Sequence, residues 1–240
     1  MEKSVVFVHG HGHSSFCWDN FKNKFNSEKM FKLYFFNYKN HGEKRGYVDE
    51  NYTNDYYAKD LKDFIYNNKI NNYIIIGHSN GCSVIHYSIT KFMIKPQKVF
   101  LLGPLQDNYI LNILFNMVCD FNLWEFLITL KFKSKRLVKY ALFSENTNNE
   151  IIEKCLINTE EINHTKYNYF SLNKNIIENV FAYIILGDND KLIPYKLGVK
   201  SIEIYNNNGI IKTFNIGHNM MMDNGWENVC NYIINNINQN

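Results

Sequence analysis

Short runs of apolar, β-branched and aromatic residues recur along the chain, and segments with helical periodicity lie between them. Six of these runs predict strands, at residues 5–8, 32–36, 73–76, 99–102, 181–186 and 210–214. Their apolarity is continuous rather than alternating, which is typical of parallel strands buried on both faces. Between two of them, Tyr57, Leu61 and Phe64 recur at helical spacing and predict a helix that covers the sheet. The pattern indicates an α/β protein with a doubly wound, mainly parallel sheet of about six strands.

The interval from residue 104 to residue 179 interrupts this alternation. It has a helical pattern and no convincing strand, so we expect residues 1–103 and 180–240 to form one core domain and 104–179 to form an inserted helical cap. Residues 111–130 have the length of a membrane span but include Asp120 and Glu125. Because charges at mid-span are costly, an amphipathic helix is favoured over a transmembrane segment.

Composition narrows the class of protein. Of the 240 residues, 45% are hydrophobic and 20% are charged, which is typical of a soluble globular protein and not of a disordered or collagen-like chain. The net charge of +3 comes from 26 basic and 23 acidic residues scattered along the chain, without the dense basic face of a nucleic-acid binder. Five widely spaced cysteines indicate reduced thiols, and the first apolar run is too short for a signal peptide, so we expect a cytoplasmic protein.

The run Gly77-His-Ser79-Asn-Gly81 places a serine between a predicted strand and a predicted helix. A sharp turn of this kind, a nucleophile elbow, strains the serine backbone and brings helix and strand so close that glycine is needed at both flanking positions. Ser79 then lies at a helix N-terminus, where N–H groups and the helix dipole favour developing negative charge. We predict that Ser79 is a nucleophile; the alternative is a glycine-bounded turn with an incidental serine.

A serine nucleophile needs a histidine base and an acid that orients it. Asp190 and His218 follow the strands 181–186 and 210–214, at the strand ends where open α/β sheets place their sites. Asp190 is preferred to Asp188 because it comes just before Leu-Ile-Pro194, where a helix is predicted to start. Asp107, beyond the strand that ends at Leu102, is a third candidate.

Ester chemistry at a serine also requires an oxyanion hole. In such sites one backbone N–H follows the nucleophile and another comes from the loop after the first strand, here the loop His9-Gly-His-Gly-His13. We therefore expect the N–H groups of Asn80 and His11 to form the hole, each worth roughly 3 to 4 kcal/mol of transition-state stabilisation.

Four motifs in order resemble those of the α/β-hydrolase superfamily: residues 5–18, the elbow, Gly187-Asp-Asn-Asp-Lys-Leu-Ile-Pro194 and Gly217-His-Asn-Met220. The chain looks like the compact esterase, lipase and methylesterase-like branch of that superfamily. The resemblance implies that Ser79 attacks, that His218 transfers protons and that Asp190 orients it. Two positions depart from the pattern, the stretch 37–42 and Cys82, and neither belongs to the predicted triad.

These observations together predict a serine esterase or lipase-like enzyme that hydrolyses a small-molecule carboxylic ester through an acyl-enzyme, without a metal or organic cofactor. Thioester, amide and carbon–carbon bond hydrolysis would use the same three residues. Apolar residues that we expect to contact an apolar acyl group are Leu105, Phe115, Trp124 and Met220, although those in the cap could equally form its own core. Basic residues follow at 131–139, where a solvated helix face is favoured over peripheral contact with a membrane.

Two other classes of protein compete with the serine hydrolase. A non-catalytic ligand-binding protein could keep the fold, because fold alone does not establish activity. A metallohydrolase could use His9, His11 and His13, but Ser14 and Ser15 follow where a metallo-β-lactamase pattern has an aspartate before a further histidine.

Overall fold

A computed structural model describes residues 2–39, 41–44, 53–104, 135–158 and 177–239. Its centre is a six-stranded sheet in the order β2-β1-β3-β4-β5-β6, and every neighbouring pair is parallel. The predicted doubly wound parallel sheet is therefore confirmed. The strands are β1 (Lys3–Val8), β2 (Phe31–Phe36), β3 (Tyr73–His78), β4 (Lys98–Leu102), β5 (Phe181–Gly187) and β6 (Gly209–Phe214).

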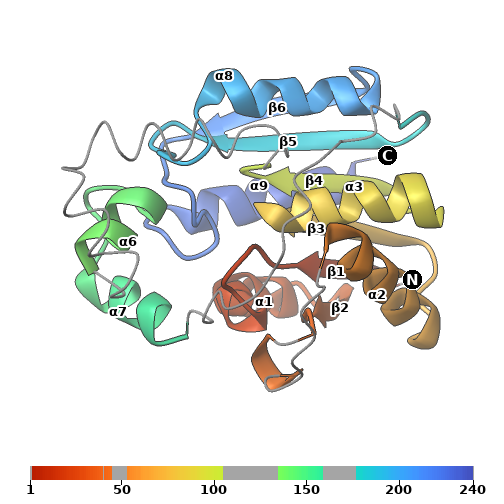
Figure 1. Ribbon diagram of the computed structural model, residues 1–240, viewed down its shortest axis with the longest axis horizontal. Helices are drawn as coiled ribbons and strands as arrows, with labels where there is room; N and C mark the ends of the chain where they lie inside the picture. The colour runs from red at the N-terminus through yellow and green to blue at the C-terminus, as the bar shows by residue number, and fades with distance from the viewer. Residues whose placement is uncertain (1, 40, 45–52, 105–134, 159–176, 240) are drawn as a thin grey trace.

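Helices cover both faces of the sheet (Figure 1). Alternate residues of β1 face opposite layers: Val5 and Phe7 belong to one hydrophobic core, and Val6 and Val8 belong to the other. The first core is closed by α1 (Asp19–Ser27) and α9 (Trp226–Asn238), and the second by α2 (Asn54–Asn67), α3 (Asn80–Phe92) and the 3₁₀ segment Val199–Tyr205. The short helix α8 (Tyr195–Gly198) lies against Leu186 of the second core through Gly198. The segment with helical spacing at 57–65 lies in α2, as expected.

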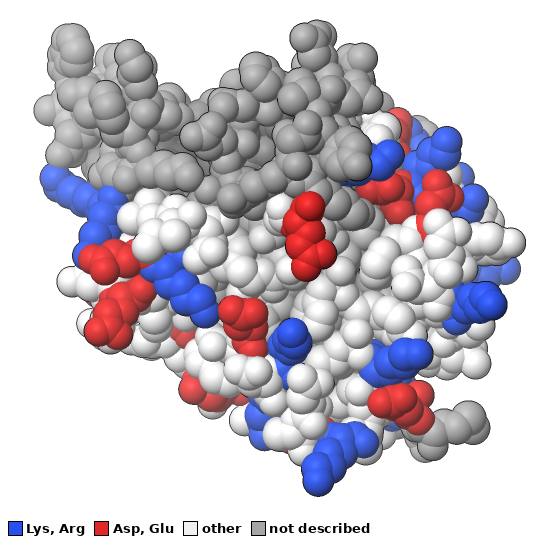
Figure 2. Space-filling model, turned by 90° about the horizontal axis from the view of Figure 1, so that it is seen from below, with Lys and Arg blue, Asp and Glu red and all other residues white. Residues whose placement is uncertain are grey.

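The outer strands differ from the central ones. All six residues of β3 are buried, whereas buried residues of β2 are confined to its two ends and Ile210 of β6 is 44% exposed. Continuous apolarity therefore predicts burial correctly for the central strand β3, whereas the two edge strands are partly open to solvent. On the face of the molecule that Figure 2 shows, lysine and arginine side chains are interspersed with aspartate and glutamate.

Two helices are described within residues 104–179, the interval predicted as a cap. They are α6 (Lys135–Leu142) and α7 (Asn149–Asn158), which lie beside the carboxyl ends of the strands (Figure 1). Ile152 and Cys155 of α7 are fully buried in the same core as α1 and α9. The described part of this interval thus contains two helices joined by a turn, and its division from the core at 104 and 179 stays a prediction.

Residues 111–130, for which an amphipathic helix was predicted, lie outside the described part of the chain. Among the described helices, none combines the length and apolar character needed to span a bilayer. Four of the five cysteines are described, and each is a buried thiol outside any disulfide: Cys17, Cys82, Cys155 and Cys230.

Candidate active site

Ser79 stands at the turn between β3 and α3. Its φ and ψ angles are 50° and −121°, a strained conformation for a residue other than glycine, and it precedes the first turn of α3. A Cβ on Gly81 would lie 2.4 Å from the carbonyl oxygen of Val8, which explains why the turn needs glycine at this position. The sequence between a buried strand and a helix thus forms the sharp elbow expected of it, with Ser79 half-buried at its tip.

Asp190 and His218 form a buried pair at the same edge of the sheet. His218 Nδ1 lies 2.7 Å from Asp190 Oδ2, and the two side chains are 3% and 1% exposed. The other carboxylate oxygen, Oδ1, accepts the backbone N–H groups of Leu192 and Ile193 at 2.9 and 2.8 Å. Because the carboxylate accepts a hydrogen bond from Nδ1–H, the neutral imidazole keeps its lone pair on Nε2, the state a general base requires.

Of the three acids considered from the sequence, Asp190 is the one that the structure brings to His218. Asp188 is exposed, and its backbone N–H donates to Phe214 O at 2.8 Å. Asp107 lies outside the described residues. Pro194 directly precedes α8, so a helix begins after Asp190 as the sequence predicted.

The elbow and the His218 loop are in direct contact. His78, the residue before Ser79, hydrogen-bonds through Nε2 to the carbonyl oxygen of His218 at 3.0 Å, and the two rings are 4.8 Å apart. The backbone N–H of Ser79 donates to Leu102 O at 2.9 Å. The next residue, Gly103, has a φ of +51°, and a Cβ there would lie 3.1 Å from His218 Nδ1 and 3.2 Å from Asp190 Oδ2. Ser79, Asp190 and His218 therefore share one rim of the sheet.

Sequence reasoning had missed His78 and Gly103. His78 occupies the variable position of the elbow motif, where any residue was accepted. Gly103 enters the sequence prediction only as the last residue of the core segment 1–103. The pair Gly103-Pro104 after a buried strand is a turn signal that could have drawn attention to this close approach.

The loop after β1 packs against the elbow. A Cβ on Gly10 would lie 3.0 Å from Ser79 Cβ and 2.8 Å from His78 Nδ1, so the backbone just before His11 approaches the serine closely. Asn80 is the first residue of α3, whose initial N–H groups have no acceptor within the helix. Both predicted oxyanion donors thus come from segments that adjoin Ser79.

Burial keeps the surrounding histidines neutral. Burial, together with a smaller effect of nearby histidines such as His41, lowers the pKa of His13 from 6.5 to about 4 and that of His11 to about 3. Burial, followed by the charge of His218, also holds the pKa of His78 well below its ordinary value. At neutral pH these imidazoles therefore add no positive charge beside the Asp190–His218 pair.

The three histidines of the first loop do not form a metal centre. His9 uses both ring nitrogens within the protein: Nδ1 lies 2.8 Å from Gly10 O, and Nε2 accepts the Tyr38 N–H at 3.3 Å. His13 Nε2 lies 3.4 Å from Asn219 Nδ2. Within the described part of the chain, no three His, Cys, Asp or Glu residues are placed to share a metal ion.

Of the four residues expected to contact substrate, only Met220 lies in the described part of the chain. Leu105, Phe115 and Trp124 lie outside the described residues. Met220 is fully buried in the core that α1 and α9 cover, so contact between Met220 and substrate stays a prediction.

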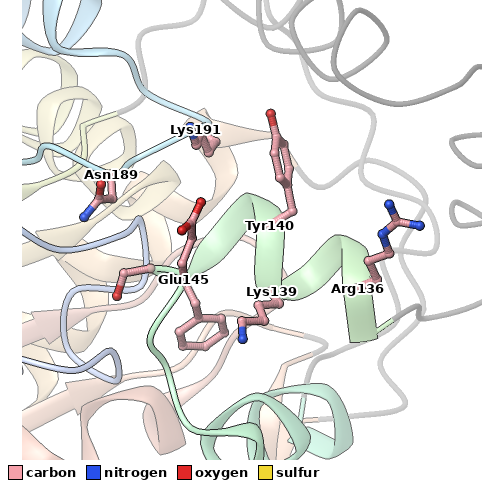
Figure 3. Close-up of a pocket in the computed structure, with 8 residues that line it drawn as sticks. Arg136, Lys139, Tyr140, Glu145, Asn189 and Lys191 are labelled. Atoms are coloured by element: carbon pink, nitrogen blue, oxygen red, sulfur yellow. The ribbon is translucent and has the colours of Figure 1, made fainter.

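A cavity of about 480 Å³ lies beside the acid of the pair (Figure 3). Asn189 and Lys191, the neighbours of Asp190, line it together with α6, and Ser79 is not among its described lining residues. Of the basic residues at 131–139, Arg136 and Lys139 line this cavity, while Lys135 pairs with Glu153 of α7 at 2.5 Å.

Known proteins resemble this chain over nearly its whole length. A Mycoplasma genitalium protein named "Putative esterase/lipase 2" is 25% identical over 225 residues, which cover 89% of this chain and 81% of that protein. A hydrolase from Oleispira antarctica superposes with a TM-score of 0.75 at 18% identity, covering 100% of this chain and 92% of the other. An esterase from Exiguobacterium antarcticum superposes with a TM-score of 0.75 at 14% identity, covering 99% of this chain and 92% of the other.

A third structure, an extracellular alpha/beta-hydrolase from a Paenibacillus species, has a TM-score of 0.71 at 12% identity and covers 97% of this chain and 98% of its own. No family model matches the sequence. The sheet order, the strained serine turn and these structural likenesses agree with one another. The chain therefore has the α/β-hydrolase fold.

Proposed function

We propose that this protein is a serine hydrolase that cleaves a carboxylic ester through an acyl-enzyme on Ser79. The observation that carries the proposal is the buried Asp190–His218 pair, in which Nδ1 and Oδ2 are 2.7 Å apart. The ring of His218 also lies against that of His78, the residue that precedes Ser79. The names of the Mycoplasma relative and the Exiguobacterium neighbour, an esterase/lipase and an esterase, point to the same chemistry.

In the first half of the reaction, Ser79 Oγ attacks the carbonyl carbon of the ester while His218 Nε2 takes the hydroxyl proton. The carbonyl π electrons move onto oxygen, and the N–H groups of His11 and Asn80 bind the resulting oxyanion. When the tetrahedral intermediate collapses, the bond to the alkoxy group breaks and His218 returns its proton to the leaving alcohol. Ser79 then carries the acyl group as an ester.

In the second half, a water molecule replaces the alcohol. His218 Nε2 takes one water proton as the water oxygen attacks the acyl carbon, and it then returns that proton to Ser79 Oγ as the acid leaves. Asp190 holds the imidazole in the tautomer that both halves need and stabilises the imidazolium formed in each. Its second oxygen, bound to Leu192 and Ile193, keeps the carboxylate from turning away.

The substrate that we propose is a small-molecule ester with an apolar acyl group. Residues 104–179 would form a cap near Ser79, with the side chains predicted there lining the acyl pocket. A panel of aryl esters of increasing acyl length tests this directly, because turnover that rises with chain length supports an extended apolar pocket.

Labelling of Ser79 tests the mechanism. The wild-type protein should turn over an aryl ester and react with a fluorophosphonate, and Ser79→Ala should lose both, with at least about a 10³-fold fall in kcat and an unchanged melting temperature. Ser88→Ala is the matched control, because Ser88 is a buried serine of α3, the helix that follows Ser79, and its hydroxyl bonds the backbone oxygens of Ala58 and Val84. A folded wild-type protein that binds aryl esters without hydrolysis or labelling would refute the proposal and favour a ligand-binding role.

A further inference from the structure

Asp223 is a fully buried carboxylate five residues beyond His218. It accepts the backbone N–H groups of Gly217 at 2.7 Å, Ser144 at 2.9 Å and Asn224 at 2.8 Å. The hydroxyl of Ser144 lies 2.9 Å from each of its oxygens, and the hydroxyl of Thr147 bonds one of them. Among the described residues, its partners are therefore all neutral donors. A buried anion solvated in this way holds its donors in one arrangement, since any lost bond leaves charge unsolvated in the interior.

These donors come from two distant parts of the chain. Gly217 directly precedes His218, whereas Ser144 and Thr147 belong to residues 142–147, which start at the last residue of α6 and end just before α7 and which we call the α6–α7 corner. The carboxylate thus bonds a residue adjacent to His218 and also a segment more than 70 residues earlier. The proposed base is therefore held by the α6–α7 corner as well as by its own strand.

Two further contacts join the same segments. The N–H of Asn219, the residue after His218, donates to Leu142 O at 2.8 Å. On the other side, a Cβ on Gly217 would lie 2.6 Å from the carbonyl carbon of Phe143, so the two backbones touch. Figure 3 shows the adjacent end of α6 beside Asn189 and Lys191, which flank Asp190. Both chain neighbours of His218, Gly217 and Asn219, are therefore in contact with the α6–α7 corner.

We propose that Asp223 is a positioning residue for His218: its carboxylate joins the His218 loop to the α6–α7 corner and so sets where Nε2 stands relative to Ser79 Oγ. The inference rests on the proposed function of His218 as general base. Asp223 touches none of the reacting atoms, and its effect is on geometry. Proton transfer tolerates little misplacement, and an error near 1 Å can cost about 100-fold in rate.

The test compares Asp223→Asn, Asp223→Glu and Ser144→Ala with the Ser88→Ala control, using an aryl ester, a fluorophosphonate and chemical denaturation. Asp223→Asn should lower kcat by about 10- to 100-fold with KM within about twofold, and should slow labelling of Ser79 by the same factor. Asp223→Glu should recover part of kcat because it restores the charge. Ser144→Ala should lower kcat less than Asp223→Asn, while Ser88→Ala should lower stability and leave kcat unchanged.

A folded Asp223→Asn protein with wild-type kcat would overturn the proposal, whatever its stability. If that variant does not fold, equal kcat values for Ser144→Ala and Ser88→Ala would overturn it instead.

The failure of the proposed function is seen separately, as an inactive and unlabelled wild-type protein. In that case the downfield proton resonance of His218 Nδ1, assigned by its loss in Asp190→Asn, decides the inference. The resonance should move or broaden in Ser144→Ala and stay unchanged in Ser88→Ala, and an unchanged resonance in both would overturn the proposal.

Discussion

His13 lies in the turn after β1, and its imidazole is only 4% exposed. Its ring centroid is 5.8 Å from that of His78, and its Nδ1 has no hydrogen-bond partner among the described atoms. Burial, then the charges of His218 and His41, lowers the pKa of His13 from 6.5 to about 4. Protonation of this side chain should therefore be coupled to unfolding.

The size of the effect follows from the two pKa values. In the unfolded chain His13 takes up a proton near pH 6.5, but in the folded protein it does so only near pH 4. The stability associated with neutral His13 is thus complete above pH 6.5 and is lost as the pH falls from 6.5 to 4. Between pH 7 and pH 5 this amounts to roughly 2 kcal/mol of the free energy of unfolding, at 1.36 kcal/mol per pKa unit.

Urea denaturation of wild-type protein and His13→Gln at pH 7 and pH 5, at constant ionic strength, measures this contribution. The wild-type protein should lose about 2 kcal/mol more than the variant on acidification, because glutamine does not titrate. His9 and His78 are present in both proteins, so their contributions cancel. Ser88→Ala should be less stable at both pH values and lose as much as the wild-type protein. Equal losses for wild type and His13→Gln would refute the reasoning.

Three further outcomes are expected. Gly103→Ala should lower kcat by about 10-fold or more with little change in KM, because its Cβ would crowd His218 and Asp190 and the position needs a positive φ; steady-state kinetics with wild-type kcat would contradict this. Asp190→Asn should lower kcat by about 10⁴-fold while the exposed Asp188→Asn leaves it unchanged, and equal activities for the two variants would reject Asp190 as the acid. A strong chelator should leave turnover of an aryl ester unchanged, because both ring nitrogens of His9 bond within the protein, and chelator-sensitive turnover would argue for metal chemistry.

The strands could be predicted from the sequence because their signal is local. Each predicted strand falls within an observed one, but β3 continues to His78 and β5 to Gly187, beyond the apolar runs. Their ends are set by pairing with the neighbouring strand, where His78 lies opposite Leu102 and Gly187 opposite Phe214. Backbone hydrogen bonding continues where side-chain apolarity stops, so hydrophobic pattern alone places strand ends too early.

The candidate site divides in the same way. Ser79, Asp190 and His218 stand in recognisable motifs after strands, so their shared edge follows from parallel topology. Asp223 carries no such signal, because its donors include Ser144, 79 residues away in the chain. Gly103-Pro104 signals a turn, but the sequence does not show that Gly103 lies against His218 and Asp190, which come from the loops after two other strands. Residues whose role depends on distant packing cannot be recognised by local spacing.

The sheet order has a consequence for synthesis of the protein. Strands β1 to β4 can assemble as soon as the first hundred or so residues leave the ribosome. β4, whose Val99, Phe100 and Leu102 are buried in the finished protein, must then wait for β5, which begins only at Phe181. Until then one side of β4 offers unpaired backbone groups flanked by apolar side chains, a template for association between nascent chains. Polypeptides that end soon after residue 104 should therefore aggregate, and passage of the ribosome through the following codons sets how long each chain is exposed to that hazard.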